Sequence, residues 1–271
     1  MTQTRAIATP APWNDVADAY TAEVALELAP YSADAIELLN PAPDAVVLDV
    51  ACGPGTCTLQ LAPRVARVDA VDFATEMVAR LQKRLTTEGV DNVHARVMDG
   101  QALGFDDGQF DAAFCMFGLM FFADPRRGLS ELVRVLAPGG RAVVATWAHP
   151  ERSPMMQQIV GALTAALPGL SPPPPAVPLD TAAHVGAALT AAGLVDVEVR
   201  AIRHGRDVRS AETLWRYFEQ GGAPIKLLRA SMGAASWQGV EAVVLATLRS
   251  TLPPLPAVLE SEALVGIGRR P

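Results

Sequence analysis

Two glycines and a carboxylate early in the chain have the types and spacing expected of a nucleotide-like ligand site. Asp49 closes the apolar run 46–48, and Gly53 and Gly55 follow within six residues. This pattern predicts a buried strand, a glycine-rich turn that lets backbone approach a ligand closely, and the N-terminus of a helix. A dinucleotide fingerprint would need a third glycine at position 58, where the chain has Thr58. The loop therefore favours a nucleotide-like ligand without a pyrophosphate.

Two further carboxylates stand at the ends of the next two expected strands. Asp72 ends the second strand and Asp99 ends the third. A carboxylate about 20 residues past a glycine turn can accept hydrogen bonds from both ribose hydroxyls. Asp99 can accept one from the exocyclic amine of adenine, and Phe73 can lie on the adenine face. These residues predict an adenosine-containing ligand.

The elements that must position these residues alternate along the chain. Strand-like runs cover 45–50, 67–72, 92–98, 110–117 and 140–147, and helix-like runs between them cover 56–63, 75–87 and 126–136. Such alternation predicts βαβ units and a mainly parallel sheet. Around this core we expect a loose stretch over the first fifteen residues, helices over 15–29, 32–39 and 181–192, and strands over 194–202 and 262–269.

The pattern changes after Trp147, where helical segments are expected over 150–167 and 210–250. A polyproline run at 172–175 is typical of a stiff surface loop. This largely apolar material could cover the carboxyl ends of the strands as a cap, which suits a dry site for a lipophilic acceptor. The cationic residues in and beside it either pair with an anionic acceptor or form a solvated face, and the solvated face is the favoured interpretation. These residues are Arg203, Arg206, Arg209, Arg216, Lys226 and Arg229.

Composition narrows the class of protein. The chain has 271 residues, half of them hydrophobic, and a net charge of −7, which argues against a nucleic-acid partner. Cys52, Cys57 and Cys115 form no disulfide framework and no zinc spacing, so we expect no metal site and a reducing, cytoplasmic location. The longest apolar run, 112–123, is too short to span a bilayer.

Four motifs carry a family resemblance: DVACGPG at 49–55, VDFATEM at 71–77, MDGQALGFDDGQFD at 98–111 and LSELVRVLAPGGR at 129–141. Their order and spacing resemble those of class I S-adenosylmethionine-dependent methyltransferases, in particular the small-molecule branch near the ubiquinone/menaquinone C-methyltransferases. The resemblance covers roughly residues 45–147. It implies an α/β, Rossmann-like fold with a mostly parallel seven-stranded sheet, an antiparallel last strand and a helical cap.

The resulting division is a single methyltransferase domain over 1–271. It comprises an N-terminal helical segment (1–44), a cofactor-binding core (45–147) and cap insertions (148–180 and 207–256). The oligomeric state is left open, with a homodimer as one option.

The resemblance also implies roles for individual residues toward S-adenosylmethionine. Asp49 would orient the glycine loop and the cofactor's amino group, Asp72 would hold the ribose, and Tyr20 would close over the cofactor. Ala51 departs from the glycine that many members have there, which narrows the loop. Gly53 and Gly55 would lie under the methionine part, Gly100 and Gln101 at the adenine, and Phe117 beside the methyl group. The full set of cofactor-binding residues implied in this way is Tyr20, Asp49, Ala51, Gly53, Gly55, Asp72, Phe73, Met77, Asp99, Gly100, Gln101 and Phe117.

The expected reaction is methyl transfer to a small, lipophilic or aromatic acceptor, by O- or C-methylation, in secondary or quinone metabolism. A general base is needed only if the acceptor must lose a proton, and His149 is then the best-placed candidate catalytic residue. The alternative for His149 is a residue that caps the next helix. The stretch after the fourth strand reads CMFGLM and lacks an Asn- or Asp-Pro-Pro-aromatic motif, which disfavours nucleic-acid or protein substrates.

Two other functions stay open from the sequence. One is a nicotinamide-dependent oxidoreductase, NAD(P) being the cofactor, which Thr58 in place of the third glycine disfavours. The other is a non-catalytic module that binds S-adenosylmethionine without turnover.

Overall fold

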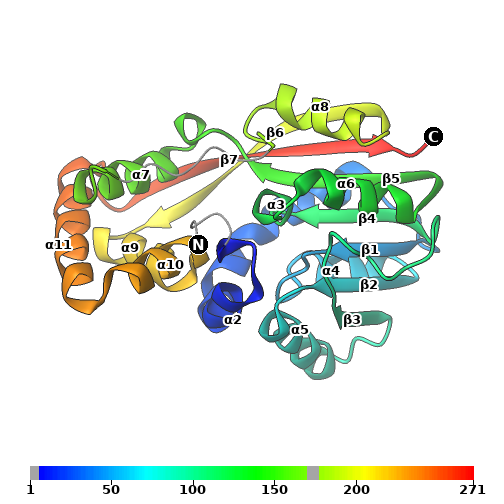
Figure 1. Cartoon of the computed structure of the whole chain (residues 1–271), viewed down its shortest axis with the longest axis horizontal. Helices are drawn as coiled ribbons and strands as arrows, with labels where there is room; N and C mark the ends of the chain where they lie inside the picture. Colours follow the sequence, from blue (N-terminus) through cyan, green and yellow to red (C-terminus); the bar gives the residue numbers. More distant parts are fainter. Residues whose placement is uncertain (1–5, 170–176) are drawn as a thin grey trace.

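A seven-stranded sheet organises the chain, in the order β3-β2-β1-β4-β5-β7-β6 (Figure 1). The computed structural model describes residues 6–169 and 177–271, so the polyproline run expected as a loop lies outside the described residues. The strands are β1 (Val46–Val50), β2 (Arg67–Asp72), β3 (Val93–Val97), β4 (Phe110–Met116), β5 (Leu136–Trp147), β6 (Val195–Val208) and β7 (Ala257–Arg269). Strand β7 runs antiparallel to both of its neighbours, β5 and β6, and all other neighbouring strands of the sheet are parallel. The predicted fold class is therefore confirmed.

Alternating side chains of the buried strands pack against helices on both faces of the sheet. On one face Val47 and Phe114 contact α3 (Ala25–Leu39) and α4 (Thr58–Leu61), and α5 (Thr75–Glu88) packs beside them through Leu81. On the other face Leu48 and Val144 contact α6 (Pro125–Val135) and α8 (Ala182–Ala191). The strand ends that carry the carboxylates are thereby held from both sides.

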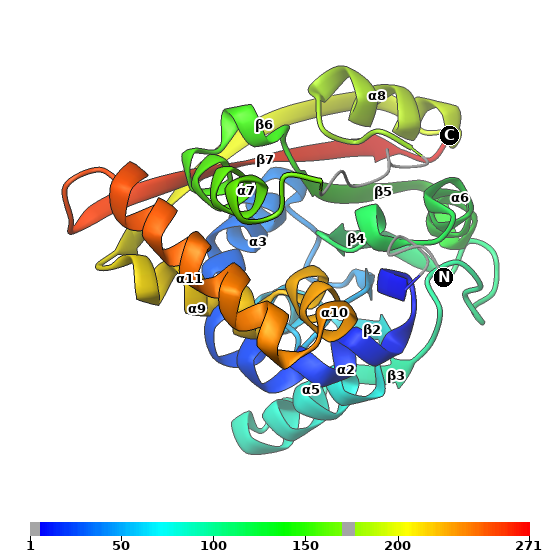
Figure 2. The same cartoon turned by 60° about the vertical axis from the view of Figure 1, so that its left-hand side comes forward.

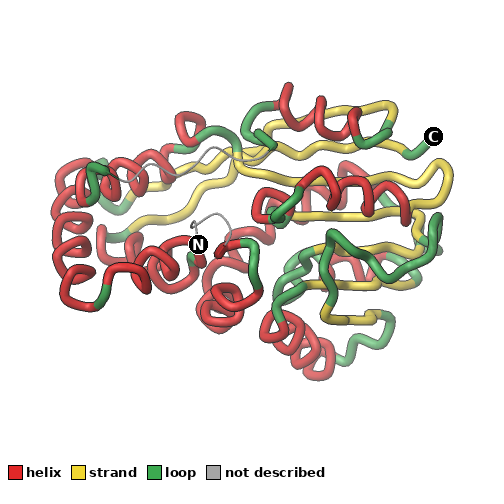
Figure 3. The backbone as a smooth tube through the Cα atoms, viewed as in Figure 1, coloured by secondary structure: helices red, strands yellow, loops and turns green. Residues whose placement is uncertain are grey.

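A second region is built on an extension of β6 and β7. Beyond the end of β5, residues 203–208 pair with 257–262 as a two-stranded arm. Four helices pack around this arm, namely α7 (Pro154–Ala166), α9 (Ala211–Gly221), α10 (Ala223–Met232) and α11 (Ala234–Thr251) (Figure 2). Figure 3 shows how helices dominate this end of the molecule, and we call the arm with its four helices the helical module. The module has its own apolar core, in which Trp215 and Trp237 stack with ring centroids 5.9 Å apart.

The N-terminal helices differ from the prediction. Helix α2 (Pro10–Ala19) begins within the stretch expected to be loose, and a π-helical turn, η1 (Tyr20–Val24), joins it to α3. The helical path continues through Pro30, which lacks only the N–H that would donate to residue 26. The expected pair of helices over 15–29 and 32–39 was therefore wrong in its boundaries, because one proline does not end a helix whose apolar face is buried.

Several strand boundaries also differ. The structure extends β6 to Val208 and begins β7 at Ala257, because these strands continue to pair beyond the main sheet. Strand β5 begins at Leu136 rather than at residue 140, and its pairing with β4 shifts between Phe110 and Ala112. Short 3₁₀ turns complete the chain: η2 (Ala62–Arg64), η3 (Leu119–Phe121) and η4 (Pro150–Arg152). In the described part of the chain, no helix combines the length and apolar character needed to cross a membrane.

Candidate active site

A cleft with about 640 Å³ of empty space, open solvent included, lies at the carboxyl ends of β1, β2 and β4. Its lining residues all lie between Ala8 and Phe122. The structure brings most of the predicted cofactor residues together here: Tyr20, Ala51, Gly53, Asp72, Phe73, Met77, Asp99, Gly100, Gln101 and Phe117. Asp49 lines an adjoining cavity that shares Tyr20, Gly53 and Phe117 with the cleft.

Asp72 fixes the glycine loop to the end of β2. The Gly53 N–H donates to its Oδ2 at 2.9 Å, and the Ala74 N–H donates to its Oδ1 at 2.8 Å. Burial raises the pKa of Asp72 to about 6, although these two backbone N–H groups lower it. Gly53 has φ +55°, a conformation that favours glycine, so loop shape and carboxylate position are coupled.

Asp49 carries an acceptor atom without a partner in the part of the chain that the structure describes. Its side chain is 1% exposed, and the Thr58 hydroxyl donates to its Oδ2 at 2.6 Å. Its Oδ1 is buried and receives no hydrogen bond. Burial raises the pKa of Asp49 to about 7, and the nearby charge of Asp72 adds to this. A buried, unpartnered carboxylate oxygen is costly unless a ligand supplies the donor.

Gly55 has a packing function rather than a place at the cleft. It has φ +89°, and a Cβ there would lie 2.4 Å from Leu81 Cδ1 of α5. Glycine therefore allows the loop to approach α5 closely. Of the two glycines, Gly53 lines the cleft and Gly55 packs against α5.

Two non-glycine residues beside the cleft are in the left-handed region, Ala51 at φ 56° and Phe117 at φ 58°. A Cβ on Gly118 would lie 2.4 Å from the Cβ of Ala51, so Gly118 leaves the space for the Ala51 methyl group. Phe117 is 5% exposed, and its ring centroid lies 4.3 Å from that of Trp147. Backbone strain of this kind gathers at functional sites, where the surrounding structure holds it in place.

The loop after β3 is held close to the cleft by side-chain hydrogen bonds. Asp99 Oδ1 accepts from the Gln101 N–H at 2.9 Å and from Gln101 Nε2 at 3.0 Å. Gln101 Oε1 accepts from the Asp124 N–H at 2.7 Å, which ties this loop to the start of α6. A Cβ on Gly100 would lie 2.6 Å from the Phe122 ring, so only glycine fits there.

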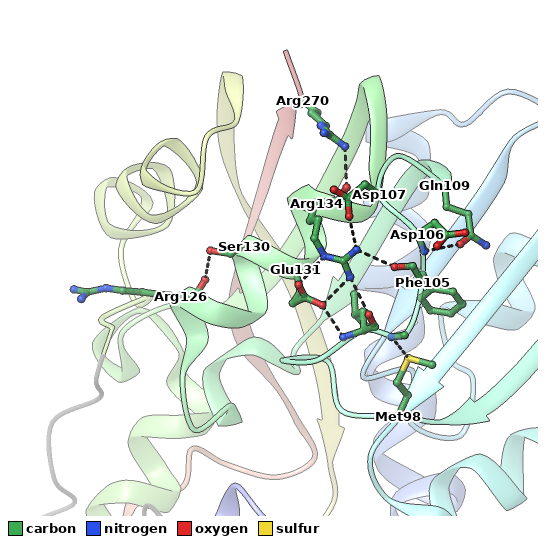
Figure 4. A network of polar contacts seen from close by, with 12 residues as sticks. Met98, Phe105, Asp106, Asp107, Gln109, Arg126, Ser130, Glu131, Arg134 and Arg270 are labelled. Carbon is green, nitrogen blue, oxygen red and sulfur yellow. Dashed lines mark hydrogen bonds and ion pairs between the residues drawn. The ribbon is translucent and has the colours of Figure 1, made fainter.

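A second set of contacts clamps the far part of the same loop to α6 (Figure 4). Arg134 donates to the carbonyl oxygens of Leu103 and Phe105, each at 2.8 Å. Its guanidinium also bonds Glu131, whose Oε2 accepts from the Leu103 N–H at 2.7 Å. The Arg134 hydrogen bond lowers the pKa of Glu131. Loop 98–109 is thus positioned by charged contacts on the side away from the cleft.

The N-terminal helices close the cleft. Trp13 of α2 contacts Phe121 of η3 edge to face, with centroids 4.8 Å apart. Tyr20 lies over Gly53, with its Cε1 3.9 Å from the position of a Cβ there. Burial, and then the charge of Asp72, raises the pKa of the Tyr20 phenol far above its usual range. Tyr20 and Asp72 both line the cleft.

Sequence reasoning missed several lining residues. They are Ala8, Trp13, Met98, Met116, Gly118, Phe121 and Phe122. The only sequence signal for most of them was their place directly after strands β3 and β4, which end at the cleft. Trp13 had no such signal, because its segment was expected to be loose.

The structure does not bring His149 into either cavity. Its side chain is half-exposed, and its Nδ1 accepts from the Glu151 N–H at 3.5 Å, at the start of η4. This geometry favours the alternative of a capping residue over that of a general base.

The helical module contributes no lining residue to the cleft in the described part of the chain. Its apolar residues pack into their own core, while the lining of the cleft comes from residues 8–122. Several of its cationic residues form internal ion pairs: Arg203 with Glu262, Arg206 with Glu27 and Arg229 with Glu219. These arginines are therefore engaged within the protein.

In residues 6–169 and 177–271, no group of three or more His, Cys, Asp and Glu side chains is arranged to hold a metal ion. The three cysteines are buried and free, and burial raises the pKa of each thiol. They are therefore uncharged packing residues near neutral pH.

Comparison with known proteins agrees with this geometry. Residues 47–140 match a family described as "Methyltransferase domain". A demethylmenaquinone methyltransferase of Clavibacter sepedonicus is 44% identical over 105 residues, which cover 38% of this chain and 42% of that protein. Another from Renibacterium salmoninarum is 35% identical over 136 residues, covering 50% and 55%. The chain thus spans about half the length of these curated relatives.

Solved structures share the fold across most of the chain. The YcgJ protein of Bacillus subtilis superposes with a TM-score of 0.59 at 20% identity, covering 88% of this chain and 97% of that one. A putative methyltransferase of Bacillus halodurans gives a TM-score of 0.59 at 18% identity, covering 89% and 98%. Residues 47–140 thus match a methyltransferase domain, and the strand order and the solved structures show the class I methyltransferase fold. S-adenosylmethionine is the methyl donor of this class.

Proposed function

We propose that this protein transfers the methyl group of S-adenosylmethionine to a small, apolar acceptor. The single observation that carries the proposal is the pair of buried carboxylates at the cleft. Asp72 shapes the loop and presents its oxygens at the end of β2, and Asp49 keeps an unpartnered oxygen in the adjoining cavity.

The residues present fit this donor. The unpartnered Asp49 Oδ1 suits the donor's amino group, because a cationic ammonium supplies the missing hydrogen bond and offsets the buried charge. Asp72 suits the ribose hydroxyls, and Asp99 with the backbone at Gly100 and Gln101 suits the adenine. Thr58, in the place of a third glycine, is engaged with Asp49, which supports a ligand without a pyrophosphate.

The rest of the cleft supports an apolar acceptor. The side chains of Trp13, Met98, Met116, Phe121 and Phe122 form this wall. When bound, the donor supplies an electrophilic methyl group, which an acceptor takes by in-line displacement. The chain's own task is then to align the acceptor and exclude water, and alignment can contribute up to about 7–11 kcal/mol.

The acceptor class proposed here is lipophilic or aromatic, with O- or C-methylation in secondary or quinone metabolism. The names of the demethylmenaquinone methyltransferases support a planar, apolar acceptor, and the matched segments cover 38% and 50% of this chain. In this proposal the acceptor nucleophile needs no base from His149, whose side chain is half-exposed outside the cleft.

The test is transfer from S-adenosylmethionine with a labelled methyl group into an extract of methyl-depleted cells, followed by partition into organic, aqueous and macromolecular fractions. We expect label in the organic fraction with the wild-type protein and none with Asp72→Ala. Label in the macromolecular fraction would overturn the acceptor class. Binding of S-adenosylmethionine without transfer to any fraction would favour the non-catalytic module, and an NADH fluorescence change would favour the oxidoreductase.

A further inference from the structure

Arg206, on the arm of the helical module, contacts two other elements at the same time. Its Cζ lies 3.9 Å from the ring centroid of Tyr217, in α9. Its guanidinium forms an ion pair with Glu27 of α3, and its Nη2 lies 3.7 Å from a carboxylate oxygen of Glu23 in η1. One side chain therefore joins the module to the helix that enters the cleft.

These contacts are largely removed from solvent. The Glu27 side chain is 13% exposed, that of Arg206 is 24% exposed, and Tyr217 is 6% exposed. The same guanidinium therefore contacts both the Tyr217 ring and the Glu27 carboxylate. Removal of the guanidinium would leave the Glu27 carboxylate without this partner in a desolvated position, which is the costly case for a buried ion pair.

The same contact region bears directly on Tyr20. Glu23 and Glu27 follow Tyr20 by about one and two helical turns on the continuous path from η1 into α3. Helix α9 packs closely on η1, since a Cβ on Gly221 would lie 2.5 Å from Val24 Cγ2. Helix α10 adds Ala223 to the cluster formed by Val16 and Ala17 of α2. Helices α9 and α10 of the helical module thus pack against η1 and the adjoining helix α2.

We propose that Arg206 is a positioning residue for donor binding: through Glu27 and Tyr217 it holds the η1 turn so that Tyr20 stays over the glycine loop. The inference rests on the proposed function for its consequence, which is tighter donor binding. It assigns the helical module a purpose at the site, although the module contributes no lining residue in the described chain.

The first measurement compares the Kd of S-adenosylhomocysteine for Arg206→Met, Arg206→Lys and a matched control, Arg203→Met. Arg203 lies on the same strand and pairs with Glu262, whose side chain is 5% exposed, but it does not contact η1. We expect Arg206→Met to raise the Kd by about tenfold and Arg203→Met by less than about twofold. Arg206→Lys keeps a charge for Glu27 but loses the flat stacking on Tyr217, so it should restore part of the affinity. Equal losses in Arg206→Met and Arg203→Met would overturn the inference.

A double-mutant cycle separates positioning from general destabilisation. In a Tyr20→Ala background, Arg206→Met should change the Kd by less than about twofold, because the residue that it positions is gone. A loss in that background as large as in the wild type would show that Arg206 acts by another route, and would overturn the inference.

Hydrogen exchange of the ligand-free protein makes this inference independent of the proposed function. Arg206→Met should speed amide exchange over residues 17–27, and Arg203→Met should not. Failure of the wild-type protein to bind S-adenosylmethionine or S-adenosylhomocysteine would end the proposed function. Unchanged exchange over residues 17–27 in Arg206→Met would end the positioning role, whatever the protein binds.

Discussion

The core around β1–β4 and the helical module differ in where they place polar, charged and aromatic residues. In the core, polar and glycine residues gather at strand ends: Asp49 and Asp72 are buried charges, and Ala51 and Phe117 adopt strained backbone conformations. The module instead buries a stacked Trp pair and keeps most of its charges in ion pairs near its surface. Buried carboxylates and strained backbone conformations lower the stability of the core at the site. The module instead packs against the helices that lie over that site. Substitutions in the two regions should therefore change different quantities.

The largest effect on stability is expected in the module. Trp215→Ala removes a side chain that is 2% exposed and should lower the free energy of unfolding by about 3–5 kcal/mol. The control, Trp215→Phe, keeps an aromatic ring and removes a buried indole N–H that lacks a partner among the described residues, so it should cost less than about 1.5 kcal/mol. Urea unfolding of both variants checks this. Equal stability of Trp215→Ala and wild type would mean that the module's core adds little.

The largest effect on donor binding is expected in the core. Asp72→Ala should weaken S-adenosylmethionine binding by about 3 kcal/mol or more, since each hydrogen bond to a charged acceptor contributes about 1.5–3 kcal/mol. Its free energy of unfolding should change much less, because ionising a buried carboxylate with a raised pKa already opposes folding at neutral pH.

The matched control for Asp72 is Asp69→Ala on the same strand. Asp69 is equally buried but pairs with Arg67 and Arg96 away from the cleft. Calorimetric titration should show weak binding only for the Asp72 variant. Parallel losses of affinity in both variants would mean that strand β2, rather than the Asp72 carboxylate, is what binding requires.

A steric test addresses the strained turn. Gly118→Ala should lower the free energy of unfolding by about 1–3 kcal/mol, because the new methyl group meets Ala51 Cβ at 2.4 Å. Ala51→Gly removes both this clash and a left-handed alanine, so the double variant Ala51→Gly/Gly118→Ala should recover most of the loss. Thermal unfolding of the three variants measures the coupling, and purely additive effects would contradict the contact.

The two core carboxylates also predict a dependence on pH. Burial raises the pKa of Asp72 to about 6 and of Asp49 to about 7, from 3.8, so the folded state keeps these protons to a higher pH than the unfolded state does. Their contribution to the stability of the free protein therefore falls as pH rises from about 4 through 6–7.

Donor binding should follow the opposite trend, because a cationic amino group and ribose hydroxyls favour the ionised carboxylates. The Kd of S-adenosylmethionine should fall by more than about tenfold from about pH 5.5 to about pH 7.5, with proton release in titrations in different buffers. Asp72→Asn should flatten the lower part of this profile. A Kd independent of pH in the wild type would contradict the assignment of both carboxylates.

The smallest effect is expected at His149. His149→Ala should change kcat by less than about threefold, since its half-exposed ring only caps η4. Turnover measured across pH 6–8 checks this, and a loss of about a hundredfold would restore His149 as a general base.

The sequence predicted the core well for physical reasons. Asp49, Gly53 and Asp72 occupy positions that follow from strand ends and a tight turn, which are local properties. Trp13 and Phe121 were missed because their contact joins residues 108 positions apart, across a cleft that only the folded chain creates. His149 was favoured by its place after β5, yet the direction of its side chain depends on the turn that it caps.

The η1 turn affects the rotational phase of helix α2 relative to helix α3. A π-helical turn holds one more residue than an α-helical turn, so it shifts the phase of everything before it by about 100°. If residues 10–39 instead formed one regular α-helix, α2 would be rotated about its axis by about this angle relative to the sheet. Trp13 would then turn away from Phe121, although no residue of the cleft had been replaced. The π-helical turn therefore determines which face of α2 lies against the cleft.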